Sequence, residues 1–146
     1  MTNNKNVLGS IRINMVMEKT PSYGVLTKSD ILRKYGWLED EIKEHIYAVY
    51  LNNKNKIIGD KLITLGTSNA SLVDTQDITR VALLCNAQAV VLCHNHPSGD
   101  PTPSSDDVNV TQKIKKALNY FDIKMLDHIV IGKNGSVSMK EIGEIF

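Results

Sequence analysis

Two histidines, His94 and His96, stand two positions apart directly after the apolar run Ala89–Cys93. The continuous apolar character of this run predicts a central β-strand that is covered on both faces. Since side chains alternate along a strand, we expect both imidazoles to point to the same side of the sheet. Two neutral imidazoles that converge in this way form half of a zinc site. The ends of strands in α/β sheets are also where binding crevices lie.

Asp107 is the candidate for a third metal ligand, for a geometric reason. The helix expected over Ser105–Phe121 carries an apolar stripe made of Val110, Ile114, Ala117, Leu118 and Phe121. At about 100° per residue, Asp107 falls within roughly 40° of the centre of that stripe, whereas Asp106 points about 100° away. A carboxylate that faces inward costs free energy unless a positive group meets it, and a metal held by the two histidines would do so.

The same segment also fits a purely structural interpretation. Ser104 and Asp107 have the spacing of a capping box, in which the two side chains satisfy the first backbone groups of a helix. The two roles are compatible, because a capping carboxylate keeps a second oxygen free. Cys93 adjoins His94 and is expected to face the opposite side of the strand, and Cys85 is expected in the core.

The segments that precede the histidines predict helices followed by a β-hairpin. N-cap residues at Thr27–Asp30 favour a helix that ends at Gly36, and a second short helix is expected over Leu38–Lys43. Strands are expected over His45–Leu51 and Lys56–Leu65, which turn residues separate. A bulge is expected in the second of these strands, marked by its internal glycine.

Helices and strands are expected to alternate through the rest of the chain. A helix is expected to begin at Asp74 or Thr75, a strand to run over Lys124–Ile131, and a last short strand to lie near Val137. A lead-in strand is expected around Ile11–Met15. The main order of elements, β-β-α-β-α-β-β, predicts an α/β layer architecture with a mixed sheet.

Composition places the chain among ordinary globular proteins. Of its 146 residues, 42% are hydrophobic and 23% charged, which excludes a disordered or low-complexity chain. No apolar run reaches the roughly 18 residues of a membrane span, so no membrane association is expected. Two cysteines and no visible secretory signal favour a cytoplasmic location. The net charge of +1 lacks the basic excess typical of proteins that hold duplex DNA.

The spacing of the candidate ligands resembles the JAMM motif of the JAB/MPN metalloprotease superfamily. His94-x-His96 is followed by seven residues, Ser104, two residues and Asp107. The RadC branch in particular has a sequence similar to residues 94–104, which read His-Asn-His-Pro-Ser-Gly-Asp-Pro-Thr-Pro-Ser. The similarity extends from about Glu44 to Gly143.

Two further segments resemble the RadC branch, and two features depart from it. Asp127-His128 resembles its Asp-His pair, and residues 138–143 resemble its C-terminal segment with Met139 in place of phenylalanine. Residues 74–77 replace the usual Pro-Arg-Glu, which puts the surface contacts of that segment in question. The helix-hairpin-helix module that usually precedes the domain is not seen, which weakens the case for a role in DNA repair.

The resemblance implies a fold, a cofactor and a set of residue roles. Residues 28–146 are expected to form a single-domain α/β/α sandwich of JAB/MPN, cytidine-deaminase-like architecture, after a lead-in over residues 1–27. Zn²⁺ is the implied cofactor, with His94, His96 and Asp107 as ligands and water in the fourth position. Glu44 matches the family's general base, and Ser104 matches the residue that stabilises the oxyanion. Asp127 and His128 are expected to support the fold or the site from behind the ligands.

Taken without the resemblance, Glu44 belongs to a cluster of acidic residues that is typical of solvated surface. The cluster consists of Glu39, Asp40, Glu41 and Glu44. The general-base role of Glu44 therefore comes from the family alone.

The expected function is that of a JAMM-type zinc metallopeptidase, which cleaves a peptide or isopeptide amide in a protein substrate. Two alternatives stay open, namely a catalytically silent interaction domain and a RadC-like accessory factor in DNA repair or processing. The intact set of site residues counts against the first, and the near-neutral charge counts against binding of nucleic acid. A homodimer also stays open.

Overall fold

The computed structural model describes residues 26–65 and 73–146. The helices are α1 (Lys28–Tyr35), the 3₁₀-helix η1 (Gly36–Asp40), α2 (Thr75–Leu84) and α3 (Ser105–Asn119). The strands are β1 (His45–Leu51), β2 (Ile57–Leu65), β3 (Ala89–Asn95), β4 (Lys124–Gly132) and β5 (Gly135–Ser138). The lead-in strand expected around Ile11–Met15 lies outside the described residues.

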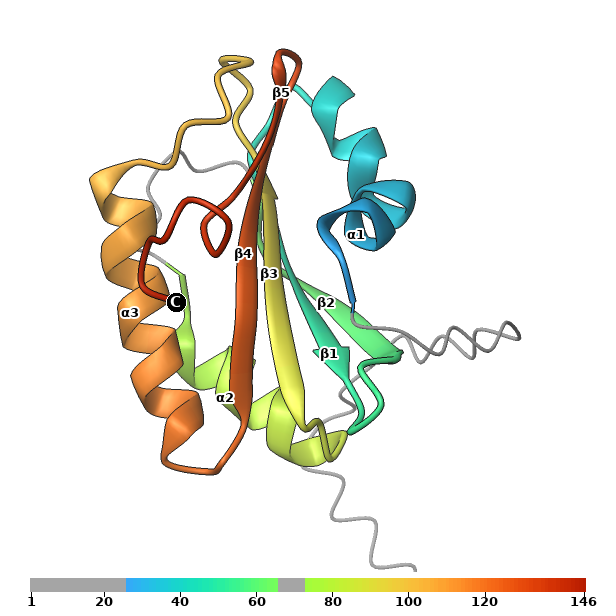
Figure 1. The fold of residues 1–146 in the computed structure, drawn as a ribbon, viewed down its shortest axis with the longest axis vertical. Helices are drawn as coiled ribbons and strands as arrows, with labels where there is room; N and C mark the ends of the chain where they lie inside the picture. The colour runs from blue at the N-terminus through green and yellow to red at the C-terminus, as the bar shows by residue number, and fades with distance from the viewer. Residues whose placement is uncertain (1–25, 66–72) are drawn as a thin grey trace, which may run out of the picture.

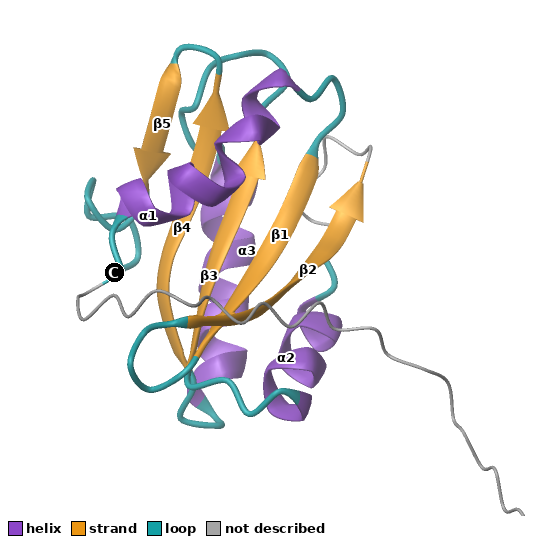
Figure 2. Cartoon of the chain, turned by 90° about the vertical axis from the view of Figure 1, so that its right-hand side faces the viewer, coloured by secondary structure: helices purple, strands orange, loops and turns teal. Residues whose placement is uncertain are grey.

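One mixed sheet forms the centre of the domain, with the strand order β2-β1-β3-β4-β5. β1 pairs antiparallel with β2 and β3, β3 and β4 are parallel, and β5 returns antiparallel along β4. α3 makes the crossover between the two parallel strands (Figure 1). α1 lies on one face of the sheet, while α2 and α3 lie on the other (Figure 2). The predicted α/β sandwich with a mixed sheet is confirmed.

Alternation along β1 and β3 divides the core into two layers. Ile46, Ala48 and Tyr50 on β1 join the layer that packs against α2 and α3, with Val90 and Leu92 from β3. The intervening residues of both strands join the layer beneath α1 and η1, so that β3 is buried along its whole length. The end of β3 is therefore held rigidly from both faces, which suits a strand that presents ligands.

The chain between α1 and β1 differs from the prediction. The short helix expected over Leu38–Lys43 is wrong: the 3₁₀-helix η1 ends at Asp40. The first helix does end at Gly36 as predicted, since Gly36 is the C-cap of α1, with a φ of −57° in the right-handed helical region. The carbonyls of Glu41 and Lys43 accept hydrogen bonds from the side-chain amide of Asn95, which ties this segment to β3 and leaves it irregular.

The end of α3 and the bulge in β2 also differ in detail from expectation. α3 ends at Asn119, so Phe121 lies beyond the helix and is half exposed and not part of the buried stripe. One irregularity in the β1–β2 register falls at Ile58, next to Gly59, and a second falls at Ile63.

Across the described ranges, none of the helices combines the length and the apolar character that crossing a membrane requires.

Candidate metal centre

The two histidines converge where β3 leaves the sheet. His94 is the penultimate residue of β3 and is fully buried, whereas His96 follows the strand and is partly exposed. Their Nε2 atoms lie 2.9 Å apart. The ring of His96 is oriented by its Nδ1, which lies 2.9 Å from the carbonyl oxygen of Asp100. The turn of the Pro-rich loop thus directs the second imidazole back over the first.

Asp107 faces the histidine pair from the first turn of α3, where it is buried. Its Oδ1 lies 3.3 Å from Nε2 of His94, and its Oδ2 lies 3.2 Å from Nε2 of His96. The capping box is present as well, since the Ser104 backbone donates to Asp107 Oδ2 and the Asp107 backbone donates to Ser104 Oγ. The cap thus holds the carboxylate in the orientation that meets both imidazoles.

Glu44 completes the cluster from the segment that enters β1. It is 7% exposed, so it does not belong to a solvated acidic surface. Its Oε1 lies 3.8 Å from Nε2 of His94, and its Oε2 is buried without a hydrogen-bond partner among the described residues. Burial raises the pKa of this carboxyl above its ordinary value. An unpaired buried carboxylate oxygen is costly, which indicates a missing polar partner at this point.

Asn95 holds the segment that carries Glu44. Its Oδ1 accepts a hydrogen bond from the backbone N–H of His45 at 2.7 Å. Its side-chain amide donates to the carbonyls of Lys43 at 3.0 Å and Glu41 at 3.3 Å. These bonds tie both sides of Glu44 to the residue that separates the two histidines.

A β-bulge in β4 decides which of Asp127 and His128 reaches the cluster. Val90 pairs with Met125, but Val91 pairs with Asp127, so one extra residue is inserted in β4. The insertion turns His128 toward α3, where its Nε2 lies 2.6 Å from Nδ1 of His94. It turns Asp127 to the opposite face of the sheet.

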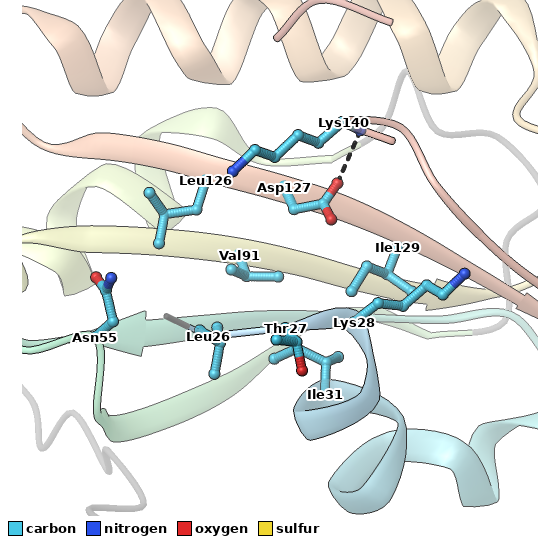
Figure 3. A pocket seen from close by; sticks show the side chains of 10 residues that line it. All are labelled: Leu26, Thr27, Lys28, Ile31, Asn55, Val91, Leu126, Asp127, Ile129 and Lys140. Atoms are coloured by element: carbon cyan, nitrogen blue, oxygen red, sulfur yellow. Dashed lines mark hydrogen bonds between the residues drawn. The ribbon is translucent and has the colours of Figure 1, made fainter. Parts of the chain in front are cut away.

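On that opposite face Asp127 lines a cavity of about 200 Å³ between α1 and the sheet (Figure 3). Its two oxygens accept hydrogen bonds from the backbones of His128 and Lys140 and from the hydroxyl of Ser138. These bonds join β4 to the chain that follows β5. Asp127 is therefore a structural residue, and only His128 of this pair contacts the histidine cluster.

The charged groups of the cluster shift one another's protonation. Burial opposes ionisation of Asp107, but the contacts of its two oxygens with the imidazoles of His94 and His96 outweigh it and hold the pKa of its carboxyl far below the ordinary value. The hydrogen bond to Asp107 raises the pKa of His96. Burial lowers the pKa of His128 well below its ordinary value, so this imidazole is neutral at neutral pH.

The donor atoms fit a zinc ion. One ligand atom from each of Glu44, His94 and His96 lies within 4.8 Å of the others. The Nε2 atoms of His94 and His96 lie 2.9 Å apart, and each lies near a different oxygen of Asp107, His94 at 3.3 Å from Oδ1 and His96 at 3.2 Å from Oδ2. Each of these distances is close to the length of one edge of a tetrahedral site. Zinc bonds of about 2.05 Å separate the ligand atoms of a tetrahedron by roughly 3.3 Å. Two imidazoles with a carboxylate are a donor set that zinc commonly takes.

Sequence reasoning missed two residues that organise the cluster, namely Asn95 and Thr111. Asn95 lies between the histidines, and its position alone does not show that its side chain reaches the segment before β1. Thr111 lies one helical turn after Asp107 on the buried face of α3, and this spacing was the available signal. Cys93 lies in the apolar layer beneath α1, which confirms that it faces away from the histidines.

Comparisons with known proteins show which family the sequence is similar to. A family model of the RadC-like JAB domain matches residues 26–144. A UPF0758 protein of Pelodictyon phaeoclathratiforme is 44% identical over 108 residues, which are 74% of this chain and 49% of that protein. A UPF0758 protein of Clostridium botulinum is 45% identical over 103 residues, which are 70% of this chain and 45% of that protein.

A UPF0758 protein of Listeria monocytogenes is 46% identical over 101 residues, which are 69% of this chain and 45% of that protein. The chain thus spans about half the length of the curated relatives that it matches. The match of the family model covers nearly all of the described fold, including every residue of the histidine cluster. The chain belongs to the family of RadC-like JAB domains.

Proposed function

We propose that this domain is a zinc-dependent hydrolase that cleaves an amide bond in a peptide or an isopeptide-linked protein. The observation that carries the proposal is the contact of Asp107 with both His94 and His96, beside an unpaired oxygen of Glu44. A structural zinc site closes its coordination with protein ligands, whereas a catalytic site keeps a position for water. The partly exposed face of His96 leaves this cluster open to a substrate.

The two carboxylates are suited to different roles. Asp107 contacts both imidazoles and is held by the N-terminus of α3, so we assign it as the third ligand. Glu44 lies farther from His94, at 3.8 Å, and its other carboxylate oxygen has no hydrogen-bond partner among the described residues, so we assign it as the general base. Zinc held by His94, His96 and Asp107 would lower the pKa of a bound water and polarise the amide carbonyl.

Glu44 and Ser104 then act on the reacting groups. Glu44 takes the proton of the attacking water and can deliver it to the leaving amine. Ser104 accepts the Asp107 backbone N–H at its Oγ, which leaves its own hydroxyl proton free to donate to the developing oxyanion. Ser104 is exposed at the start of α3, which suits a donor that a substrate can reach.

The test is zinc-dependent hydrolysis by the purified protein. A panel of peptides and isopeptide-linked conjugates is incubated with protein that has been stripped with a chelator and then reloaded with zinc. We expect cleavage of at least one amide only in the reloaded sample. Equal cleavage by stripped and reloaded protein would contradict the proposal.

Ser104→Ala separates the oxyanion role of Ser104 from its capping role. We expect the rate of hydrolysis to fall by at most about 10³-fold, since one oxyanion donor is removed. Loss of the N-cap should also lower the free energy of unfolding by about 1 kcal/mol. Steady-state kinetics and denaturant unfolding measure the two effects. Ser105→Ala, at the next and equally exposed position, should leave the rate unchanged, and an unchanged rate in Ser104→Ala would remove the oxyanion role.

A further inference from the structure

A chain of hydrogen bonds runs from the backbone of α3 to the buried nitrogen of His94. Thr111 Oγ donates to the carbonyl oxygen of Asp107 at 2.5 Å. The same Oγ lies 2.6 Å from Nδ1 of His128, and Nε2 of His128 lies 2.6 Å from Nδ1 of His94. All three side chains in the chain are buried. This series of hydrogen bonds ends at Nδ1 of His94, whereas the Nε2 of the same ring contacts His96 and Asp107.

The direction of the first bond is set by the carbonyl of Asp107. A carbonyl oxygen can only accept, and two oxygens 2.5 Å apart repel each other unless a proton lies between them. The single hydroxyl proton of Thr111 is therefore directed at Asp107. The sulfur of Met139, at 3.9 Å from the hydroxyl, is a weak competing acceptor. Toward His128 the hydroxyl must accept, so Nδ1 of His128 carries a proton.

The second bond follows from the first. The His128 ring is buried, and its hydrogen-bond partners among the described residues, Thr111 and His94, carry no negative charge, so a second ring proton would be a buried charge without a counter-charge. With its one N–H at Nδ1, the ring has a bare Nε2. The contact of 2.6 Å with His94 then requires the proton of His94 Nδ1. A neutral His94 with that proton has a bare Nε2. This is the atom that lies 2.9 Å from His96 Nε2 and 3.3 Å from Asp107 Oδ1.

We propose that Thr111 and His128 are positioning residues that fix the tautomer of His94, so that its Nε2 lone pair points at the cluster. That the bare Nε2 binds a metal rests on the proposed function, but the position of the proton on Nδ1 does not. Partners of this kind, which bind the outer nitrogen of a ligating histidine, orient the ring and make it more basic. Asp107 is thereby coupled to His94 twice, by its carboxylate and, through Thr111 and His128, by its backbone carbonyl.

The experiment reads the tautomer in metal-free protein, where hydrolysis plays no part. Long-range ¹H–¹⁵N spectra of ¹⁵N-histidine-labelled protein, at a pH where His94 is neutral, show which ring nitrogen carries the proton. For the wild type we expect a proton on Nδ1 and none on Nε2 of His94. A protonated Nε2 in the wild type would overturn the proposal without any need for a variant.

Two substitutions at Thr111 supply a matched pair. Thr111→Val keeps the shape but removes the hydroxyl, whereas Thr111→Ser keeps the hydroxyl. We expect Thr111→Val to mix the two tautomers of His94 and to weaken zinc binding by roughly 10–100-fold, the usual effect of losing an outer partner. Thr111→Ser should retain the wild-type tautomer and zinc affinity. Equal tautomers in Thr111→Val and the wild type would overturn the proposal.

The readouts distinguish the two proposals. The predicted tautomer in a protein that binds no zinc would support the role of Thr111 and His128 and contradict the proposed function. A wild type that cleaves amides with zinc, but whose His94 carries its proton on Nε2 before loading, would support the proposed function and overturn this inference.

Discussion

The Glu44→Gln variant should hydrolyse an amide substrate roughly 10²–10⁴ times more slowly than the wild type, the usual contribution of a positioned general base. Glutamine keeps the shape of the side chain but cannot accept a proton from water at neutral pH. Zinc binding should survive, because the ligands assigned to the metal are His94, His96 and Asp107. The measurement is kcat/KM on a substrate that the wild type cleaves, together with the zinc content of both proteins.

Glu39→Gln is the matched control for this prediction. Glu39 belongs to the same acidic segment but lies exposed on η1, and its replacement should leave the rate unchanged. A Glu44→Gln variant that cleaves as fast as the wild type would show that another group takes the proton. Loss of zinc in this variant would instead show that Glu44 is a metal ligand. A carboxylate oxygen of Glu44 lies within 4.8 Å of a ring nitrogen of both His94 and His96.

The second large effect is expected from Asp107→Asn. Asparagine retains an oxygen that can accept the backbone N–H of Ser104, so the start of α3 should persist. It removes the charge that faces both imidazoles, at 3.2 and 3.3 Å. Because this replaces a direct ligand, we expect zinc affinity to fall by more than the roughly 10–100-fold that losing an outer partner costs. Competition with a zinc-binding dye measures the affinity.

Asp106→Asn provides the control for Asp107→Asn, since it makes the same change one residue earlier. Asp106 is exposed in the first turn of α3 and contacts neither histidine. Its replacement should leave zinc affinity within a few-fold of the wild type. Equal losses in the two variants would mean that the charge of the helix start, and not coordination by Asp107, governs binding.

The sequence was sufficient to predict the parts of the site that depend on local periodicity. The alternation of side chains along β3 predicted that His94 and Cys93 lie on different faces of the sheet, and the structure confirms this. The apolar stripe of α3 predicted that Asp107 faces inward and Asp106 outward, and Asp107 is buried whereas Asp106 is exposed. These features follow from the repeat of a single strand or helix, which short windows of sequence carry.

Other parts of the site depend on contacts between segments far apart in the chain. Glu44 is held in its buried position because the Asn95 side chain hydrogen-bonds to the chain around it, from about fifty positions away in the sequence. The choice of His128 over Asp127 follows from a bulge in β4 that only the pairing with β3 reveals. Periodicity within one segment contains no information on either, so sequence patterns could not predict them.

The 3₁₀-helix η1 shows the same limit. Leu38–Lys43 has the composition of a short helix, but the side-chain amide of Asn95 binds the carbonyls of Glu41 and Lys43 and fixes the end of this segment against β3. A tertiary contact of the site thus overrode the local preference of this segment. The incorrect helix prediction thus concerns the segment that leads to Glu44, whose conformation is set by contacts near the histidine cluster and not by local helix propensity.

Elemental analysis of the wild-type protein, purified without a chelator, shows directly whether the histidine cluster binds zinc. We expect one zinc per chain, retained in Cys93→Ser and lost in His96→Ala. Cys93 lies on the far face of β3 from the cluster, whereas Nε2 of His96 contacts both His94 and Asp107. A wild type that carries no divalent metal and takes up none when zinc is added would contradict this expectation.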